Sequence, residues 1–225
     1  MNKLFSFVRL DFITIKPYFT IKNLLIFAVV AVFLTTMSGN ISSGMGVGIM
    51  IGTLFISYPF AIGEKSNLDA LYITLSLNRK TVVAGRYLFA LTFNICAIIF
   101  SIFFAIVGTV VTGATGLGMG TSDILLTGVL LAAVFIVIQS IQLPFFFKMG
   151  YTKAKLFSIV PFVALMAGYM VFMTASKENG IINSIESFLE RMTNGVLVGF
   201  AVLALLLICY VSYRLSLVFY IKREF

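Results

Sequence analysis

Long apolar runs, separated by short polar connections, dominate the hydrophobic pattern of this 225-residue chain. The hydrocarbon core of a bilayer is about 30 Å thick, and a helix that crosses it needs about 20 consecutive apolar residues. Six runs approach or exceed this length: residues 23–37, 44–62, 82–111, 124–147, 156–173 and 195–218. Hydrophobic residues make up 60% of the sequence, above the share of about 45–50% in soluble domains. The pattern therefore predicts an all-α polytopic membrane protein, with six transmembrane helices in one domain over residues 1–225.

Two further segments have amphipathic patterns that indicate helices lying along the membrane surface. In residues 1–20 the apolar positions recur at roughly helical spacing, and Pro17 marks a break. These positions are Leu4, Phe5, Val8, Phe12 and Ile15. We expect an interfacial helix here on the cytoplasmic side, with its basic residues toward lipid headgroups. In residues 179–193 a similar pattern predicts an outer amphipathic helix between the fifth and sixth spans, with an apolar face formed by Ile181, Ile182, Ile185, Phe188, Leu189 and Met192.

The connection at residues 64–80 has the pattern of a short helix between two spans. Ser66 and Asp69 resemble a capping box, which begins a helix. The apolar positions that follow share one helical face: Leu68, Leu71, Tyr72 and Leu75. Asn78 or Thr81 can then cap the third span. Two interpretations remain open, namely an interfacial loop that only sets the topology and a docking element for a cytoplasmic partner.

The distribution of Lys and Arg predicts the orientation of the chain. There are 16 such residues against 8 Asp and Glu, which gives a net charge of +8. Most of them fall in the N-terminal segment, residues 64–86, residues 148–155 and the tail from Arg214, whereas the alternate connections carry few. Basic residues collect in cytoplasmic loops of membrane proteins, so we expect a multi-pass cell-membrane protein with both termini in the cytoplasm. The basic residues do not form a patch typical of nucleic-acid binding, and no nucleic-acid partner is expected.

Residue types needed for catalysis or metal binding are scarce in the sequence. The chain has no histidine, the commonest general base and metal ligand, and no Walker A motif. No charge lies at the middle of a span, and Arg86 and Arg214 are placed where they could snorkel to the cytoplasmic surface. We therefore expect no catalytic residues, no metal site, no bound cofactor and no ion coupling within this chain.

Three polar side chains inside the apolar runs could line a substrate path, namely Asn94, Gln139 and Gln142. Amide side chains in membrane helices also form hydrogen bonds between helices. The sequence leaves both roles open for these residues.

Two stretches resemble the permeases of ABC-2 type transporters, in particular the small bacterial class. They are "EKSNLDALYITLSLNRKTVVAGRYL", which is similar to the cytoplasmic loop of that class, and "FVRLDFITIK", which is similar to its N-terminal opening. The class commonly has a proline where Ser76 stands here. The resemblance implies a permease subunit with a coupling helix between the second and third spans, which sits in a cleft of a separate ATPase subunit.

The resemblance also implies partners and site residues. The ATPase would bind the ATP and Mg²⁺, and a second permease subunit, identical or different, would complete the transporter. The cargo of similar permeases, those of phenol-soluble modulin exporters, implies amphipathic or antimicrobial peptides. The residues that would dock the ATPase are Glu64, Lys65, Ser66, Asn67, Leu68, Asp69, Leu71, Tyr72, Leu75, Arg79 and Lys80, with Lys148 and Lys153 in a second, smaller contact.

A different class of function remains compatible with the pattern. A membrane scaffold or immunity protein that sequesters peptides or a sensor partner would not transport anything. Such a protein would protect or signal even when the ATP hydrolysis of a partner is abolished.

Overall fold

The computed structural model describes residues 3–39, 41–66, 68, 71–72, 77–111, 121–157, 159–161, 163–164, 167–168 and 194–223. Helices account for nearly all of these residues, and no strand occurs among them. The helices are α1 (Lys3–Ile15), α2 (Ile21–Ser38), α3 (Ile41–Lys65), α5 (Arg79–Val111), α6 (Thr121–Phe157) and α9 (Asn194–Lys222), and a 3₁₀ turn at Lys16–Tyr18 follows α1.

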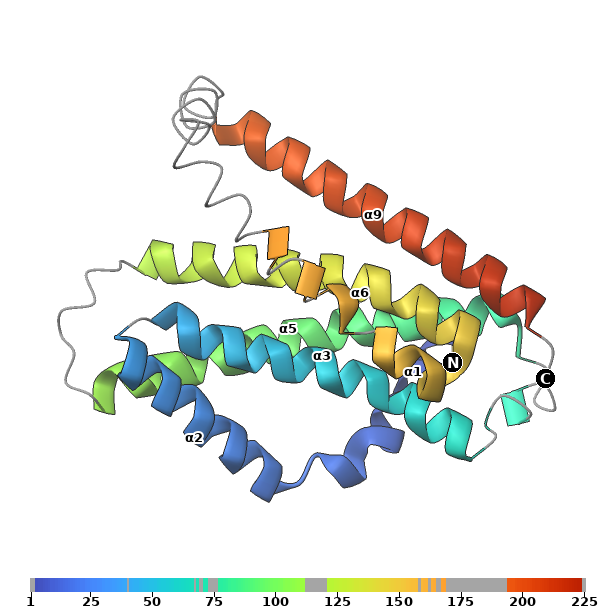
Figure 1. Cartoon of the computed structure of the whole chain (residues 1–225), viewed down its shortest axis with the longest axis horizontal. Helices are drawn as coiled ribbons and strands as arrows, with labels where there is room; N and C mark the ends of the chain where they lie inside the picture. The colour runs from blue at the N-terminus through green and yellow to red at the C-terminus, as the bar shows by residue number, and fades with distance from the viewer. Residues whose placement is uncertain are drawn as a thin grey trace.

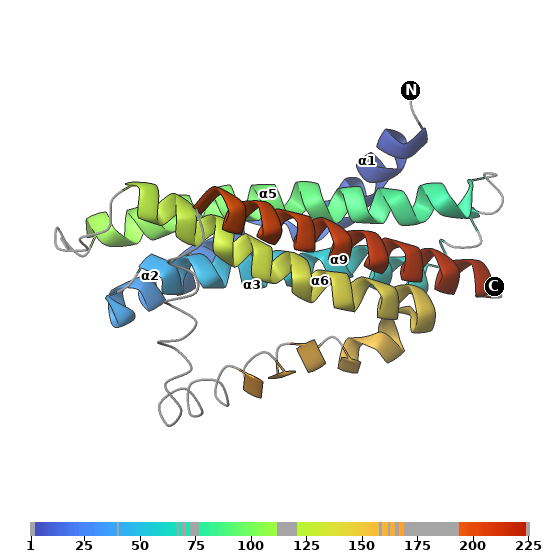
Figure 2. The ribbon, with the colours of Figure 1, turned by 90° about the horizontal axis from the view of Figure 1, so that it is seen from above.

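The long helices run side by side along the longest axis of the molecule (Figure 1). α3 packs against α2, α5 and α6, and α9 packs against α6 and α5. Seen from above, α9 lies over the seam between α5 and α6 (Figure 2). Its ribbon is near α6 at its C-terminal end and separates from it toward Asn194 (Figure 1). α1 packs across α5 and α3, so the N- and C-terminal ends lie toward the same end of the bundle.

Four helices within the described residues are long and apolar enough to cross a membrane. They comprise Ile21–Ser38, Arg79–Phe103, Ile124–Phe157 and Val198–Lys222. The range expected for the fifth span, residues 156–173, is described only in part, and the outer helix expected at residues 179–193 lies outside the described residues. The described residues thus form an all-helical structure with several helices of membrane-spanning character.

The fourth apolar run continues as a helix beyond its expected end. The sequence predicted a span over residues 124–147 and a loop over 148–155, but α6 continues to Phe157. The helix is broken at Gly150, where φ is 75° and ψ is 174°, a conformation that is essentially restricted to glycine. The expected loop is therefore a short helical segment that begins at Tyr151.

Side-chain hydroxyls join α9 to its neighbours in the bundle. The Tyr87 hydroxyl of α5 is within hydrogen-bond distance of the hydroxyls of Ser212 and Ser216 on α9. Ser212 also donates to the backbone carbonyl of Ser140 on α6. Ser212 and Ser216 are both buried. These polar contacts fix which side of α9 faces the bundle, because apolar side chains alone cannot distinguish a neighbouring helix from lipid.

Candidate functional site

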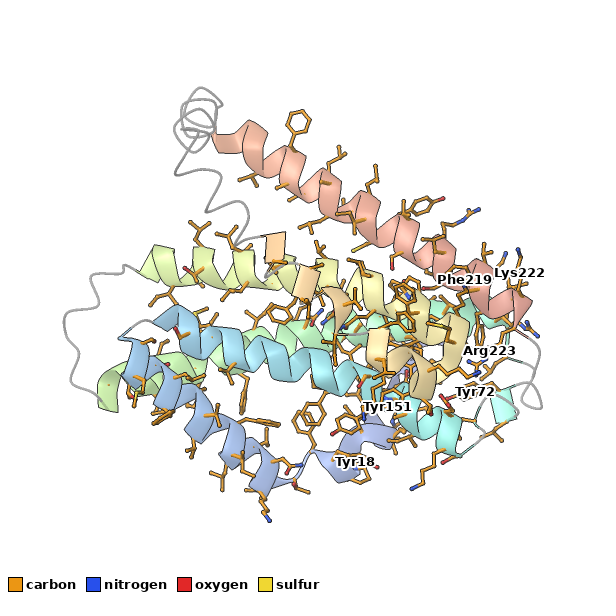
Figure 3. All side chains as sticks on the ribbon, in the orientation of Figure 1. Tyr18, Tyr72, Tyr151, Phe219, Lys222 and Arg223 are labelled. Carbon is orange, nitrogen blue, oxygen red and sulfur yellow. The ribbon has the colours of Figure 1, made fainter. Side chains whose placement is uncertain are left out.

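Polar and charged side chains gather at one end of the bundle, which we call the charged end. It comprises α1, the last turn of α3, the first turns of α5, the end of α6 and the C-terminal end of α9. Tyr72, Tyr151, Lys222 and Arg223 lie at this end (Figure 3). Most of the docking residues implied by the sequence resemblance also fall here, which makes the charged end the candidate functional site.

A buried ion pair joins α1 to α5 at the charged end. Nη1 of Arg86 lies 3.4 Å from Oδ1 of Asp11, and the two side chains are 5% and 1% exposed. The guanidinium also lies over the ring of Phe60, 4.6 Å from its centroid. This corrects the expectation that Arg86 snorkels to the surface, because the packing of α1 over α5 closes that route and supplies a carboxylate instead.

Burial opposes the charge on Asp11. It raises the pKa of this carboxyl from 3.8 to about 6, although the positive charge of Arg86 lowers it. Within the described part of the chain, neither carboxylate oxygen has a hydrogen-bond partner. Removing ions from water costs several kcal/mol each, and the mutual attraction compensates for this only with good geometry and further hydrogen bonds. The pair therefore serves to position α1 more than to stabilise the fold.

The buried face of α1 differs from the face predicted by the sequence. Phe7, Val8, Asp11 and Ile15 are buried, whereas Phe5 is 62% exposed. The prediction followed the apolar spacing and did not include Phe7 or Asp11 in the face. The spacing of Phe7, Asp11 and Ile15, each four residues apart, contains the correct face. Reading an acidic residue as part of a packed stripe would have required knowing its partner, Arg86.

The segment between α3 and α5 turns one of its expected docking residues inward. Tyr72 is 2% exposed, and its ring packs edge-on against Phe7 with centroids 5.2 Å apart. Its hydroxyl accepts a hydrogen bond of 3.5 Å from Nη2 of Arg86. Leu68 packs against the same apolar cluster, whereas Leu71 is 45% exposed. Tyr72 therefore holds the segment on the bundle and is not itself open to a partner.

Other residues of the expected coupling segment are either exposed or not described. Lys65 and Ser66 are exposed, and Asn67, Asp69 and Leu75 lie outside the described residues. Asn78 caps α5, since its side-chain oxygen accepts from the backbone N–H of Lys80 at 3.1 Å. Of the two caps considered from the sequence, the structure uses the first.

Glu64 reaches from the last turn of α3 to the break in α6. Its Oε2 accepts hydrogen bonds from the backbone N–H groups of Tyr151 and, at 3.1 Å, of Thr152. Burial opposes the charge on Glu64, yet these hydrogen bonds and the charge of Arg223 together hold its pKa below the ordinary value. Glu64 thus caps the N-terminus of a helical segment from a different helix.

Arg79 connects the start of α5 to the end of α9. Its Nη1 donates to the backbone carbonyls of Tyr220, at 3.1 Å, and Ile221. A third bond of 3.3 Å goes to the carbonyl of Arg223. The last carbonyls of a helix have no partner within it, so Arg79 satisfies the C-terminal end of α9.

The remaining basic docking residues lie on the surface of the charged end. Lys80, Lys148 and Lys153 are all exposed. The ammonium of Lys148 lies over the ring of Phe219, 5.1 Å from its centroid. The structure therefore separates the basic residues of the expected docking set into two groups: Arg79 acts within the bundle, and these lysines are open to solvent or a partner.

Two of the three residues expected in a substrate path form a mutual pair. Asn94 on α5 and Gln139 on α6 exchange two hydrogen bonds, of 2.6 and 2.8 Å, between their buried side-chain amides. Both residues line a mainly apolar groove of about 470 Å³ between α5, α6 and α9. Gln142 is also buried but is not among the groove residues. The interhelical hydrogen bond is thus present, and the same pair contributes to the wall of a groove.

The described residues contain no cluster of three or more Cys, Asp or Glu side chains that could hold a metal ion. The acidic residues described at the charged end, Asp11 and Glu64, are each committed to the contacts given above. The contacts of these two carboxylates join α1 to α5 and α3 to α6.

A family model described as ABC-2 family transporter protein matches residues 6–221 of the chain. The match covers nearly the whole sequence and includes most of the helices described above. Comparisons with curated proteins and with solved structures found no match. Family membership implies an ABC transporter with an ATPase partner and a membrane bilayer. The chain therefore belongs to the ABC-2 family of transporter proteins, as the resemblance of its sequence predicted.

Proposed function

We propose that this protein is the permease subunit of an ABC exporter and that a separate cytoplasmic ATPase docks at its charged end. The proposal rests on one observation: two neighbouring residues in the segment between α3 and α5 differ in how far they are buried. Tyr72 is pinned against Phe7 and Arg86 inside the bundle, whereas Leu71, its neighbour, is 45% exposed. An exposed apolar side chain beside a rigidly held one suits a docking contact whose movement must reach the helices behind it.

The contacts at the charged end supply a route for such movement. Tyr72 contacts Arg86 on α5, and Arg86 pairs with Asp11 on α1. A displacement of the docking segment would therefore act on both helices at once. Because packed interiors deform little, rigid elements transmit such displacements better than loops do. A second permease subunit would present an equivalent docking segment, and two ATPase subunits that close on ATP would move both.

The proposed orientation places the charged end in the cytoplasm. Basic residues at this end include Lys65, Lys80, Lys148, Lys153 and Lys222, which are all exposed. Their position agrees with the preference for Lys and Arg in cytoplasmic loops. The charge pattern and the need to reach a cytoplasmic ATPase thus favour the same orientation.

The groove beside Asn94 and Gln139 is the candidate part of the path for cargo. Its walls include Leu88, Leu91 and Tyr213 and are mainly apolar. The amides are satisfied by each other, so the groove presents little unmet polarity to a guest. Such a surface suits the apolar face of an amphipathic peptide, which is the cargo that we propose.

The docking claim can be tested by co-purification from the native membrane. Leu71→Asp, combined with Leu75→Asp, should abolish retrieval of the ATPase, because two charges would be placed on an apolar contact. Leu71→Met is the matched control and should retain the ATPase, since it conserves volume and apolarity. Retrieval of the ATPase with unchanged coupled activity by the double variant would contradict the proposal.

Measurements of peptide efflux and protection distinguish an exporter from a scaffold or immunity protein. With an ATPase that binds but cannot hydrolyse ATP, an exporter should lose peptide efflux and any protection that depends on it. Protection that persists under this condition would favour the scaffold.

A further inference from the structure

The break in α6 creates a short helical segment at the charged end. The backbone at Gly150 departs from helical geometry, and Tyr151–Phe157 form the segment that follows. Tyr151 stacks on Phe146 and Phe157 stacks on Phe145, with centroids 6.1 and 5.9 Å apart. These aromatic contacts are made to α6 itself. They therefore hold the segment near its own helix, and Phe146 in turn stacks on Phe60 of α3, with centroids 5.1 Å apart.

Glu64 supplies a direct hydrogen-bonded connection between the segment and α3. Its Oε2 accepts from the N–H groups of Tyr151 and Thr152, the first residues after the break. Backbone N–H groups at the start of a helix lack partners within it and favour a negative charge. A carboxylate is therefore a suitable acceptor here. The segment is capped across the bundle by a residue of another helix, although caps ordinarily come from the residue that precedes the helix.

Gly150 is required for this contact on two grounds. Its φ of 75° is a conformation that side chains disfavour. A Cβ at this position would also lie 2.8 Å from Oε2 of Glu64 and 3.2 Å from Nη2 of Arg223. The backbone at the break thus leaves space for the carboxylate, and a larger residue would displace it.

The two segments that Glu64 joins are each next to residues expected to contact the ATPase. Glu64 is in the last turn of α3, where the N–H of Ser66 bonds to the carbonyl of Ile62 at 2.9 Å, and the docking segment follows. On the other side, the segment after Gly150 carries Lys153, which is exposed. The two docking regions, far apart in sequence, therefore meet at one carboxylate.

We propose that Glu64 is a positioning residue that clamps the two docking regions into one mechanical unit. Its side chain faces the bundle rather than the ATPase, and its role is to make α3 and the segment Tyr151–Phe157 move together. This inference rests on the proposed function and names the device by which that docking site acts on two helices. Without the clamp, the segment would lose its hydrogen bonds to α3 and would follow the movement of α6 more than that of α3.

The geometry of the clamp can be tested on the purified permease by amide hydrogen exchange. In Glu64→Ala, the amides of Tyr151 and Thr152 should exchange at least about fivefold faster, because loss of a cap costs a helix end about 1 kcal/mol. Glu64→Gln retains an acceptor oxygen and should give an intermediate rate. Lys22→Gln removes a charge from an exposed residue at the start of α2 and should leave the exchange unchanged. Unchanged exchange in Glu64→Ala would overturn the clamp.

The mechanical role is tested in the complex with the ATPase, using a hydrolysis-deficient ATPase with and without ATP. In the wild type, ATP should change the exchange of peptides covering residues 60–66 and 151–157 together. In Glu64→Ala, and in Gly150→Ala, only one of the two peptides should respond. A paired response in Glu64→Ala, or no paired response in the wild type, would overturn the inference.

The experiments give one result if only the clamp inference is wrong and a different result if the proposed function is wrong. A wild-type complex that forms but shows a paired response insensitive to Glu64 refutes the clamp alone. Failure of the wild type to bind any ATPase refutes the proposed function, and the mechanical role falls with it. Thermal midpoints of the variants within a few degrees of the wild type would exclude general unfolding, and Glu64→Gln provides the test if Glu64→Ala does not fold.

Discussion

The charged end and the distal half of α9 differ in how their side chains are satisfied. At the charged end, Asp11, Tyr72 and Arg86 are buried and held by an ion pair, a hydrogen bond and aromatic contacts. Along α9, Phe200 and Leu206 are 64% and 66% exposed. The difference follows from the solvent: lipid accepts apolar side chains without cost, so only polar contacts and close packing can fix the position of a helix in a membrane.

This comparison indicates where the molecule is rigid. Each connection at the charged end joins two different helices, as Arg79 joins α5 to α9 and Glu64 joins α3 to α6. The hydrogen bonds that hold α9 to α5 lie in its C-terminal half, at the buried Ser212 and Ser216. Under the proposed function, movement imposed at the charged end would act first on the helices that these contacts join.

The largest effect is expected from removing one member of the buried ion pair. Arg86→Ala would leave the carboxylate of Asp11 buried without a partner, a change that costs about 3–5 kcal/mol. Denaturation in mixed micelles at pH 8 should show this loss. The double variant Asp11→Leu/Arg86→Met should recover most of it, because no buried charge remains. A loss below about 1 kcal/mol for Arg86→Ala would show that the charged end is not specially rigid.

The pH dependence of stability tests the burial of Asp11 at the charged end. Because burial raises the pKa of Asp11 from 3.8 to about 6, protonation contributes stability that is complete below pH 3.8 and is lost as pH rises through about 6. The shift corresponds to about 3 kcal/mol at 1.36 kcal/mol per pH unit. Wild type should therefore lose stability relative to Asp11→Asn between pH 4 and 7. Parallel pH profiles of the two proteins would refute the burial of the carboxylate.

A smaller effect is expected at the amide pair in the middle of the bundle. Asn94→Leu would leave the amide of Gln139 buried with its hydrogen bonds unmade, at a cost of about 1–2 kcal/mol. Adding Gln139→Leu should restore much of the stability, since no polar group then remains unsatisfied. If the double variant were less stable than the single one, the amides would have a role beyond pairing with each other.

The smallest effect is expected on the exposed side of α9. Leu206→Ala should change the stability by less than about 0.5 kcal/mol in micelles, because detergent or lipid surrounds this side chain in either variant. The matched comparison is Phe89→Ala on α5, a side chain that is 1% exposed and should cost about 3–5 kcal/mol. A large cost at Leu206 would reveal that this face of α9 is covered by another protein surface.

The long apolar helices could be predicted from the sequence because their signal is local. An apolar run of spanning length can adopt few structures other than a membrane helix. Accordingly, α2, α5 and α9 each begin within three residues of the expected start. The end of α6 was not predicted, because Lys148 was read as the beginning of a loop. The helix continues past that lysine to the break at Gly150, and Glu64 caps the segment that follows through a contact between residues far apart in sequence.

The arrangement of the candidate site was harder to predict, for a similar reason. Helical periodicity indicates that Leu68, Leu71 and Tyr72 can share a face, but not which way that face is turned. The neighbouring α1 decides this, since Phe7 receives the ring of Tyr72. Asp11 likewise cannot be assigned to the buried face of α1 until its partner Arg86 is known. In each case the missing information was the neighbour, and single-sequence patterns do not contain it.

The bond between Arg79 and the end of α9 has a consequence for the order of assembly. Arg79 and its acceptors are separated by 141 to 144 residues. During synthesis, α5 therefore enters the membrane long before the carbonyls that satisfy Arg79 have been made. Closing such a long loop is slow relative to the formation of the helices themselves. The nascent protein should therefore pass through a stage in which the bonds between Arg79 and the end of α9 are not yet made.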